Sequence, residues 1–370
     1  MAAGRPWITA NQVTLLRLVP MPLLSWLIYR GGVEGYKDNP YMWSALLAGI
    51  VLGCTDWVDG MLARKYGPTV LGGLLDPIAD KVFVAFAYTP FASLGLIPAW
   101  ACALMFVREF FVTALRSAYE QRALSLKTSY IAKAKTWTQM QGIGVMLLFP
   151  LVDNPAVIRP IVIAGIVGPI LAMVVRYIAK KKVWWAALWM SLSFAALLAV
   201  YEAFDSVTSV RAIMLGVVGI TWFSGVDYIF GGWRKLRAAG DFSRADAVRL
   251  IGAFTVPSLT FAVLMEPGAA AWPLFVILAC ELAVGGLDNL LSHHKKATKS
   301  LAWGGRVLGI SALLALALVV PDRFVDVFSI AAAAVSVGGC FAEFWHGRDY
   351  FLDKRIRERV LREQAAAPTP

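Results

Sequence analysis

The chain reads Asp56-Trp-Val-Asp59-Gly60-Met-Leu-Ala63-Arg64, then Lys-Tyr-Gly-Pro-Thr-Val-Leu, then Gly72-Gly-Leu-Leu-Asp76-Pro-Ile-Ala-Asp80-Lys81, between two long apolar segments. Carboxylates are costly near hydrocarbon, so four aspartates at the ends of adjacent spans indicate a function. Asp56 and Asp59 are three positions apart and Asp76 and Asp80 are four apart, so on helices each pair shares one face. Two such faces brought together suit hard divalent cations such as Mg²⁺ or Mn²⁺.

Composition places these aspartates in a membrane protein. Of the 370 residues, 59% are hydrophobic and only 16% are charged, with a mean hydropathy of +0.65. A soluble protein has about 25% charged residues, and a helix needs about 20 apolar residues to cross a membrane. No strand-like alternation competes with the apolar runs, so we expect an all-α, polytopic transmembrane helical bundle. The sequence predicts about twelve spans, near 13–30, 42–62, 78–96, 97–115, 136–152, 158–176, 184–203, 211–231, 248–265, 271–288, 301–320 and 324–345.

The placement of charge predicts the orientation of the bundle. The net charge is +11, and most Lys and Arg fall in alternate connections. By the positive-inside bias, both termini and the aspartates then lie on the cytoplasmic side, most simply of a bacterial cytoplasmic membrane. Because the charge is dispersed over short flanking loops, we expect no nucleic-acid partner. The basic segments are 64–65, 116–135, 176–182, 234–249, 293–306 and 348–362.

Two local patterns beside the aspartates carry expectations of their own. Asp76 precedes Pro77, which predicts that Asp76 caps the third span and that Asp80 lies one turn in. Asn11, Thr14 and Arg17 repeat polar groups every three residues before an apolar run. These three residues fit an interfacial helix with a snorkelling arginine, or a stripe that faces a ligand pocket beside the aspartates.

A second polar set occupies the fourth and fifth predicted spans, and its members are Arg108, Arg116, Lys133 and Lys135. Arg108 and Arg116 are about two helical turns apart and so share a face. The other three fit ordinary positive-inside residues as well as a binding site. Arg108 lies deeper and needs an anionic partner, either Glu109, another carboxylate or a substrate phosphate.

The pattern D-x2-D-G-x2-A-R, followed by G-x3-D-x3-D, resembles the signature of the CDP-alcohol phosphotransferase family. The stretches R-E-F-F-V-T-A-L-R, I-A-K-A-K-T and L-D-P-I-A-D-K resemble one branch in particular, the phosphatidylglycerophosphate synthases. The resemblance implies a six-helix core, with about six additional helices in this chain. It also implies an integral-membrane, metal-dependent enzyme in which an alcohol displaces CMP from CDP-diacylglycerol.

The resemblance assigns roles to individual residues. Asp56, Asp59 and Asp76 would be primary ligands of two Mg²⁺ or Mn²⁺ ions, and Asp80 would be the general base and would also touch the second metal. The nucleotide-binding residues would be Gly60, Ala63, Arg64 and Gly72. Guanidinium groups match phosphate oxygens, so Arg108, Arg116, Lys133 and Lys135 favour a phosphorylated acceptor, glycerol 3-phosphate. Alternatives are inositol phosphate, phosphatidylglycerol in a cardiolipin synthase and, outside the family, a polytopic transporter. The expected partners are the two substrates and membrane lipid, and a homodimer is left open.

The domain organisation has two readings. In the first, the core comprises residues 1–180. In the second it extends to 240 with a hairpin inserted near 157–205, because the stretch around Trp222–Tyr228 resembles the end of a synthase's last span. Residues 181–345 form an additional transmembrane region, and 346–370 a basic cytoplasmic tail suited to anionic lipid. No second aspartate motif follows, so we expect the chain beyond 240 to be dispensable for the chemistry.

Overall fold

The computed structural model of the chain describes residues 10–67, 70–122, 124, 130–239, 242–293 and 301–352. These residues form helices and short connections, with no strand among them, which confirms the all-α prediction. The α-helices are α1 (Ala10–Leu18), α2 (Met21–Glu34), α3 (Pro40–Tyr66), α4 (Val70–Ser93), α5 (Ala99–Glu120), α6 (Tyr130–Val152), α7 (Pro155–Lys180), α8 (Trp185–Ala203), α9 (Ser206–Phe223), α10 (Gly232–Ala239), α11 (Arg244–Leu264), α12 (Ala271–His293), α13 (Leu301–Ala317) and α14 (Val325–Leu352).

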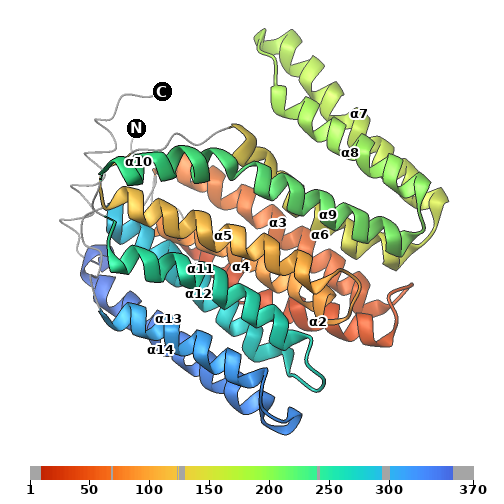
Figure 1. Cartoon of the computed structure of the whole chain (residues 1–370). Coiled ribbons are helices and arrows are strands. Elements are labelled where there is room, and N and C mark those ends of the chain that lie inside the picture. The colour runs from red at the N-terminus through yellow and green to blue at the C-terminus, as the bar shows by residue number, and fades with distance from the viewer. Residues whose placement is uncertain are drawn as a thin grey trace.

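The protein is an integral, multi-pass membrane protein. Each of the twelve predicted spans overlaps a helix, and among the described residues eight helical segments are long and apolar enough to cross a membrane. Helices α4, α5 and α6 are not among the eight, and they carry Asp76, Asp80, Arg108, Glu109 and Lys135. These three polar helices lie inside the bundle, where neighbouring helices shield their charges from lipid (Figure 1).

The two helices that bear the aspartates begin and end for identifiable reasons. Asn39 caps α3, since its side chain accepts hydrogen bonds from the backbone N–H groups of Tyr41 and Met42. The helix ends at Gly67, whose φ of 94° is a conformation open to glycine. The expectation that Asp76 caps the next helix is wrong, because α4 already begins at Val70 and carries Pro77 inside it. Membrane helices tolerate such a proline where neighbouring groups compensate for the lost hydrogen bond.

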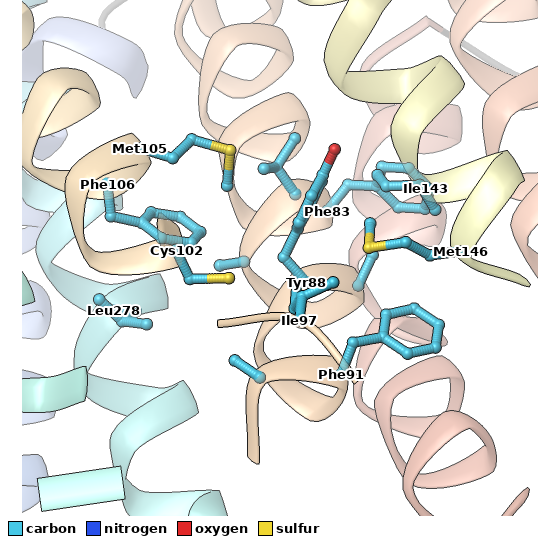
Figure 2. Packing of buried hydrophobic residues seen from close by; sticks show 14 of the residues in the cluster. Phe83, Tyr88, Phe91, Ile97, Cys102, Met105, Phe106, Ile143, Met146 and Leu278 are labelled. Atoms are coloured by element: carbon cyan, nitrogen blue, oxygen red, sulfur yellow. The ribbon is translucent and has the colours of Figure 1, made fainter. Parts of the chain in front are cut away.

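Helix α4 lies in the core of the bundle, where it packs against α12, α2 and α1 and also contacts α5 and α6. Figure 2 shows Phe83, Tyr88 and Phe91 of α4 packed between side chains of α5 and α6, with Leu278 of α12 beside α5. The Tyr88 hydroxyl, which is fully buried, donates a hydrogen bond to the carbonyl oxygen of Gln139 at 2.8 Å. The part of α4 that follows Asp80 is therefore held by densely packed side chains.

Apart from the short α10, the helices that follow α6 flank this core in two groups (Figure 1). Helix α9 packs against α5 and α6, whereas α7 and α8 pack chiefly against each other and project from the bundle as a hairpin. On the opposite side, α11 and α12 pack against α5 and α4, and α13 and α14 cover α11 and α12. Of these helices, α11 packs directly on α5, and α12 packs directly on both α4 and α5.

Candidate functional site

Helix α1 lies across the ends of α3 and α4 and joins their carboxylates. The Thr14 hydroxyl lies 3.1 Å from Asp59 Oδ2 and 2.9 Å from Asp76 Oδ1. Thr14 is fully buried and Asp59 is 3% exposed, so little water competes for these contacts. The side chain of Thr14 on α1 thus holds together a carboxylate of α3 and a carboxylate of α4.

Arg17 makes the corresponding contact with the other two aspartates. Its Nη1 lies 2.7 Å from Asp56 Oδ1, and its Nη2 lies 3.2 Å from Asp80 Oδ1. The arginine side chain is only 3% exposed, whereas that of Asp56 is 54% exposed. The guanidinium group is therefore buried against the aspartates, and the cluster is open to water at Asp56.

The donor set fits a divalent cation in chemistry. Four carboxylates from two neighbouring helices provide hard oxygen ligands and more negative charge than the single Arg17 offsets. Asp80 Oδ1 is buried, and no hydrogen bond satisfies it in addition to its ion pair with Arg17. Within the described ranges, however, no three such groups converge on a point as a finished metal site. Thr14 and Arg17 instead connect the carboxylates from the side of α1.

The predicted nucleotide-binding residues lie beside the aspartates along the chain. Gly60, Ala63 and Arg64 form the last turns of α3, and Gly72 lies in the first turn of α4. A Cβ atom at Gly60 would be 3.5 Å from Arg64 Nη1, which places the guanidinium group over this glycine. Arg64 is exposed, as a contact with a soluble headgroup requires.

The second polar set gathers around Glu109. Glu109 Oε1 accepts hydrogen bonds from Lys135 Nζ at 2.7 Å and from Arg108 Nη1 at 3.3 Å. Lys81 is also close, and its Nζ donates to the Thr113 hydroxyl at 2.5 Å. Arg116 is within electrostatic reach of Lys81 and Lys135. The side chain of Lys133 lies outside the described residues.

The side chain of Arg108 was expected to contact a substrate phosphate or a carboxylate, and it is directed toward α9 as well as toward Glu109. Its Nη2 donates to the Ser224 hydroxyl, at the end of α9, at 2.8 Å. This buried cation therefore has Glu109, one of the anionic partners expected from its depth in the span, and in addition the neutral hydroxyl of Ser224, which the sequence did not predict.

Two cavities meet at Asp80. A cavity of about 140 Å³ is lined by Asp80, Lys81, Glu109, Lys135 and Gln139, with Leu282 of α12 on one side. A larger one of about 380 Å³ runs between α3, α4 and α6 and has mostly apolar walls. Asp80, Thr136 and Met140 line both cavities. A polar compartment and an apolar compartment therefore share the same carboxylate.

Sequence reasoning missed Lys81, Glu109 and Gln139 as members of this site. Gln139 Nε2 lies 3.3 Å from Glu109 Oε1 and 3.4 Å from Thr221 Oγ1, and so connects α5, α6 and α9. One signal was available for Lys81, since it follows Asp80 directly within the fixed aspartate motif. From the sequence, Glu109 is predicted only as a counter-ion of Arg108. The structure places three cations around it.

Comparison with known proteins adds an independent finding. Residues 7–197 match the CDP-alcohol phosphatidyltransferase family. A probable phosphatidylglycerophosphate synthase of Mycobacterium tuberculosis is 35% identical over 181 residues, which cover 48% of this chain and 84% of the relative. The CDP-diacylglycerol–glycerol-3-phosphate 3-phosphatidyltransferase of Bacillus subtilis is 35% identical over 159 residues, or 39% of this chain and 81% of the relative.

No solved structure matches this chain. The family match ends within α8, so α9 and the helices from α11 to α14 lie beyond it.

Proposed function

Because the chain belongs to the CDP-alcohol phosphatidyltransferase family, we propose that it moves the phosphatidyl group of CDP-diacylglycerol to glycerol 3-phosphate, giving phosphatidylglycerophosphate and CMP. The family match covers slightly more than half of the chain, and the Mycobacterium tuberculosis relative is covered over 84% of its length. Membership makes the protein a membrane-bound transferase and sets aside the alternative of a transporter. The two relatives described above carry names for this reaction or its product.

The observation that carries the choice of acceptor is the charge around the smaller cavity. Lys81, Arg108 and Lys135 lie around one carboxylate, Glu109, so the described part of this cluster has an excess of positive charge. An uncharged alcohol would leave that excess uncompensated, whereas a phosphate group offsets it. Lys81 and Lys135 line the cavity beside Asp80 and are the residues we expect to bind the acceptor phosphate.

The position of Asp80 suits a general base. It lies where the polar cavity meets the apolar one, so an acceptor hydroxyl in the first can approach a phosphatidyl group anchored in the second. The hydroxyl oxygen forms a bond to the phosphatidyl phosphorus, the bond from that phosphorus to the CMP oxygen breaks, and the proton passes to Asp80. The apolar walls of the larger cavity accommodate the start of the acyl chains.

We expect Asp56, Asp59 and Asp76, with Asp80 at the edge, to hold Mg²⁺ or Mn²⁺. When bound, the cations would neutralise the diphosphate and the charge that develops on leaving CMP. Arg64 and Gly60 are then available for the cytidine diphosphate on the exposed end of α3. Thr14 and Arg17 orient the carboxylates from α1.

An acceptor panel with the purified full chain tests this function. CDP-diacylglycerol is offered with glycerol 3-phosphate, glycerol, inositol phosphate or phosphatidylglycerol, and CMP release and the lipid product are measured. We expect CMP release with glycerol 3-phosphate, with phosphatidylglycerophosphate as the product. Equal turnover with unphosphorylated glycerol would contradict the charge argument. Turnover with inositol phosphate or phosphatidylglycerol alone would assign the chain to another member of the family.

The metal proposal has its own test. Asp59→Asn keeps the size and the Thr14 contact but removes a charged ligand, so transfer should fall by more than the roughly 10–100-fold typical of losing a hydrogen-bonding partner of a metal ligand. Mn²⁺ binding, followed by electron paramagnetic resonance, should weaken in parallel. Glu34→Gln on the exposed end of α2 is the matched control. Undiminished transfer by Asp59→Asn in excess EDTA would end the metal interpretation.

A further inference from the structure

Helix α12, outside the family match, presses on the back of the helix that carries Asp76 and Asp80. Gly286 meets α4 at Ile78, where an added Cβ atom would be 2.8 Å from Ile78 Cγ1 and 3.3 Å from Cδ1. Ile78 is about 200° around the helix axis from both aspartates, and therefore on the opposite face. The aspartates contact α1 on one side while Gly286 sets the position of α4 on the other.

The contact lies at a place in α4 where the helix lacks one backbone hydrogen bond. Pro77 lies between Asp76 and Ile78 and has no N–H group to donate to the preceding turn. The orientation of the Asp76 turn relative to the Asp80 turn therefore depends on packing from outside the helix. Ile78 is 8% exposed, and Gly286 of α12 approaches it closely enough to give that support.

The same helix reaches the lysine side of the site. A Cβ atom at Gly285 would be 3.2 Å from Thr113 Cγ2, and the Thr113 hydroxyl accepts the hydrogen bond from Lys81. Leu282, one turn earlier, lines the cavity that contains Asp80 and Lys81. The contact of α12 thus extends from Ile78, on the back of the aspartate helix, to the proposed acceptor cavity.

Buried ion pairs next to Gly286 favour one register for this contact. Arg122, just after α5, lies 2.7 Å from Asp246 of α11, which is 1% exposed. Arg249 of α11 lies 3.2 Å from Asp288 of α12. Misaligned buried charges are costly, so such pairs favour one register between packed helices.

We propose that α11 and α12, backed by α13 and α14, are a positioning scaffold for the transferase site, with Gly286 and Ile78 as its main contact on the aspartate helix. The scaffold holds Asp80 and Lys81 at the angle that the reaction needs. The inference rests on the proposed function, because it takes Asp80 and Lys81 as members of that site. It also gives a reason against the expectation that the chain beyond residue 240 is dispensable.

The test is a double-mutant cycle at Gly286 and Ile78 in the full chain. Gly286→Ala should displace α4 and lower kcat about tenfold, since small misplacements of reacting groups cost large factors in rate. The KM for CDP-diacylglycerol should stay within about twofold, because Gly60, Ala63 and Arg64 lie on α3, whereas α12 packs mainly on α4, α5 and α14. Adding Ile78→Ala removes both clashing atoms and should return kcat to within about threefold of the native chain.

A matched control and a second variant complete the design. Gly309→Ala on α13, where a Cβ atom meets nothing within 4 Å, should leave kcat unchanged. If Gly286→Ala does not purify as a folded protein, Ile78→Ala alone should lower kcat, and adding Gly286→Ala should raise it again. Native kcat in both single variants, or a double variant no better than the poorer single one, overturns the scaffold. Absence of CMP release by the native chain overturns the proposed function instead.

Discussion

Thr14 is the side chain on which two site helices depend at once. Its hydroxyl lies between Asp59 of α3 and Asp76 of α4 and is fully buried. Hydrogen-bonding partners of metal ligands fix their orientation, and their loss typically costs about 10–100-fold in metal affinity. We therefore expect Thr14→Val to weaken Mn²⁺ affinity by that factor and Thr14→Ser to behave as the native chain. Native Mn²⁺ titration curves for Thr14→Val would show that the hydroxyl has no part in ordering the carboxylates.

Lys81 offers the cleanest test of the acceptor phosphate. Removing Lys135 would leave Glu109 without its strongest ion pair, whereas Lys81 bonds to a neutral hydroxyl that keeps its own contact with the Glu109 carbonyl oxygen. A lost charge-assisted contact costs about 1.5–3 kcal/mol. Lys81→Met should thus raise the KM for glycerol 3-phosphate about 10–100-fold and change that for CDP-diacylglycerol much less.

The control for this prediction is Lys182→Met, which removes an exposed lysine in the α7–α8 turn. It should leave both Michaelis constants unchanged. If Lys81→Met raises both constants by the same factor, the lysine is supporting the site as a whole and does not bind the acceptor selectively.

At this scale the sequence predicted types of residue better than their partners. The spacing of Asp56, Asp59, Asp76 and Asp80 is local and periodic, so a pattern in the chain predicts a shared face. The contact of Arg108 with Ser224 joins positions far apart in the sequence and depends on how α5 and α9 pack. No local pattern contains that information.

The α7–α8 hairpin makes few contacts with the rest of the bundle, because its two helices pack chiefly against each other. Ser206 Oγ donates to Asp153 Oδ1 at 2.6 Å, so the chain leaves the bundle after α6 and returns to the same point before α9. This hydrogen bond, with help from Lys37, lowers the pKa of Asp153. Since α9 packs on α5 and α6, we propose the longer reading of the core, to about residue 240 with an inserted hairpin.

Deleting residues 154–205 tests that reading. The two ends are adjacent, so a connection of about four residues should join α6 to α9 without strain. We expect the shortened chain to keep transferase activity, measured as CMP release, with some loss of thermal stability. A folded but inactive product would show that the hairpin contributes to the site and that the family match up to residue 197 marks the core more faithfully.

Pro77 shows where prediction of an element fails for a physical reason. Residues before proline avoid the helical region in isolation, which predicted a helix start at Asp76. In the bundle, α4 runs through the proline because neighbouring helices hold both sides of it. Tertiary packing here overrides the local preference of the residue before proline. The positions of the twelve predicted spans depend on hydropathy alone, so packing of this kind does not affect their prediction.

For the whole molecule, we propose that the aspartate site and both termini face the cytoplasm. The turn between α7 and α8 carries Lys180, Lys181 and Lys182, whereas Arg323 lies in a connection with little positive charge. Lys181→Cys should react with a membrane-impermeant maleimide only in inverted vesicles, and Arg323→Cys only in intact cells. The chain with its native cysteines alone gives the background, and the reverse labelling pattern would place the site outside.

The contact between Gly286 and Ile78 also has a consequence for how such a chain can evolve. Once extra helices rest on the back of the aspartate helix, two positions far apart in the sequence obey a single limit on their combined volume. A larger residue at 286 should survive in descendants only together with a smaller one at 78, in either order of acquisition. A lineage that sheds the extension would be released from that limit, and Ile78, facing lipid instead, would be free to vary in size.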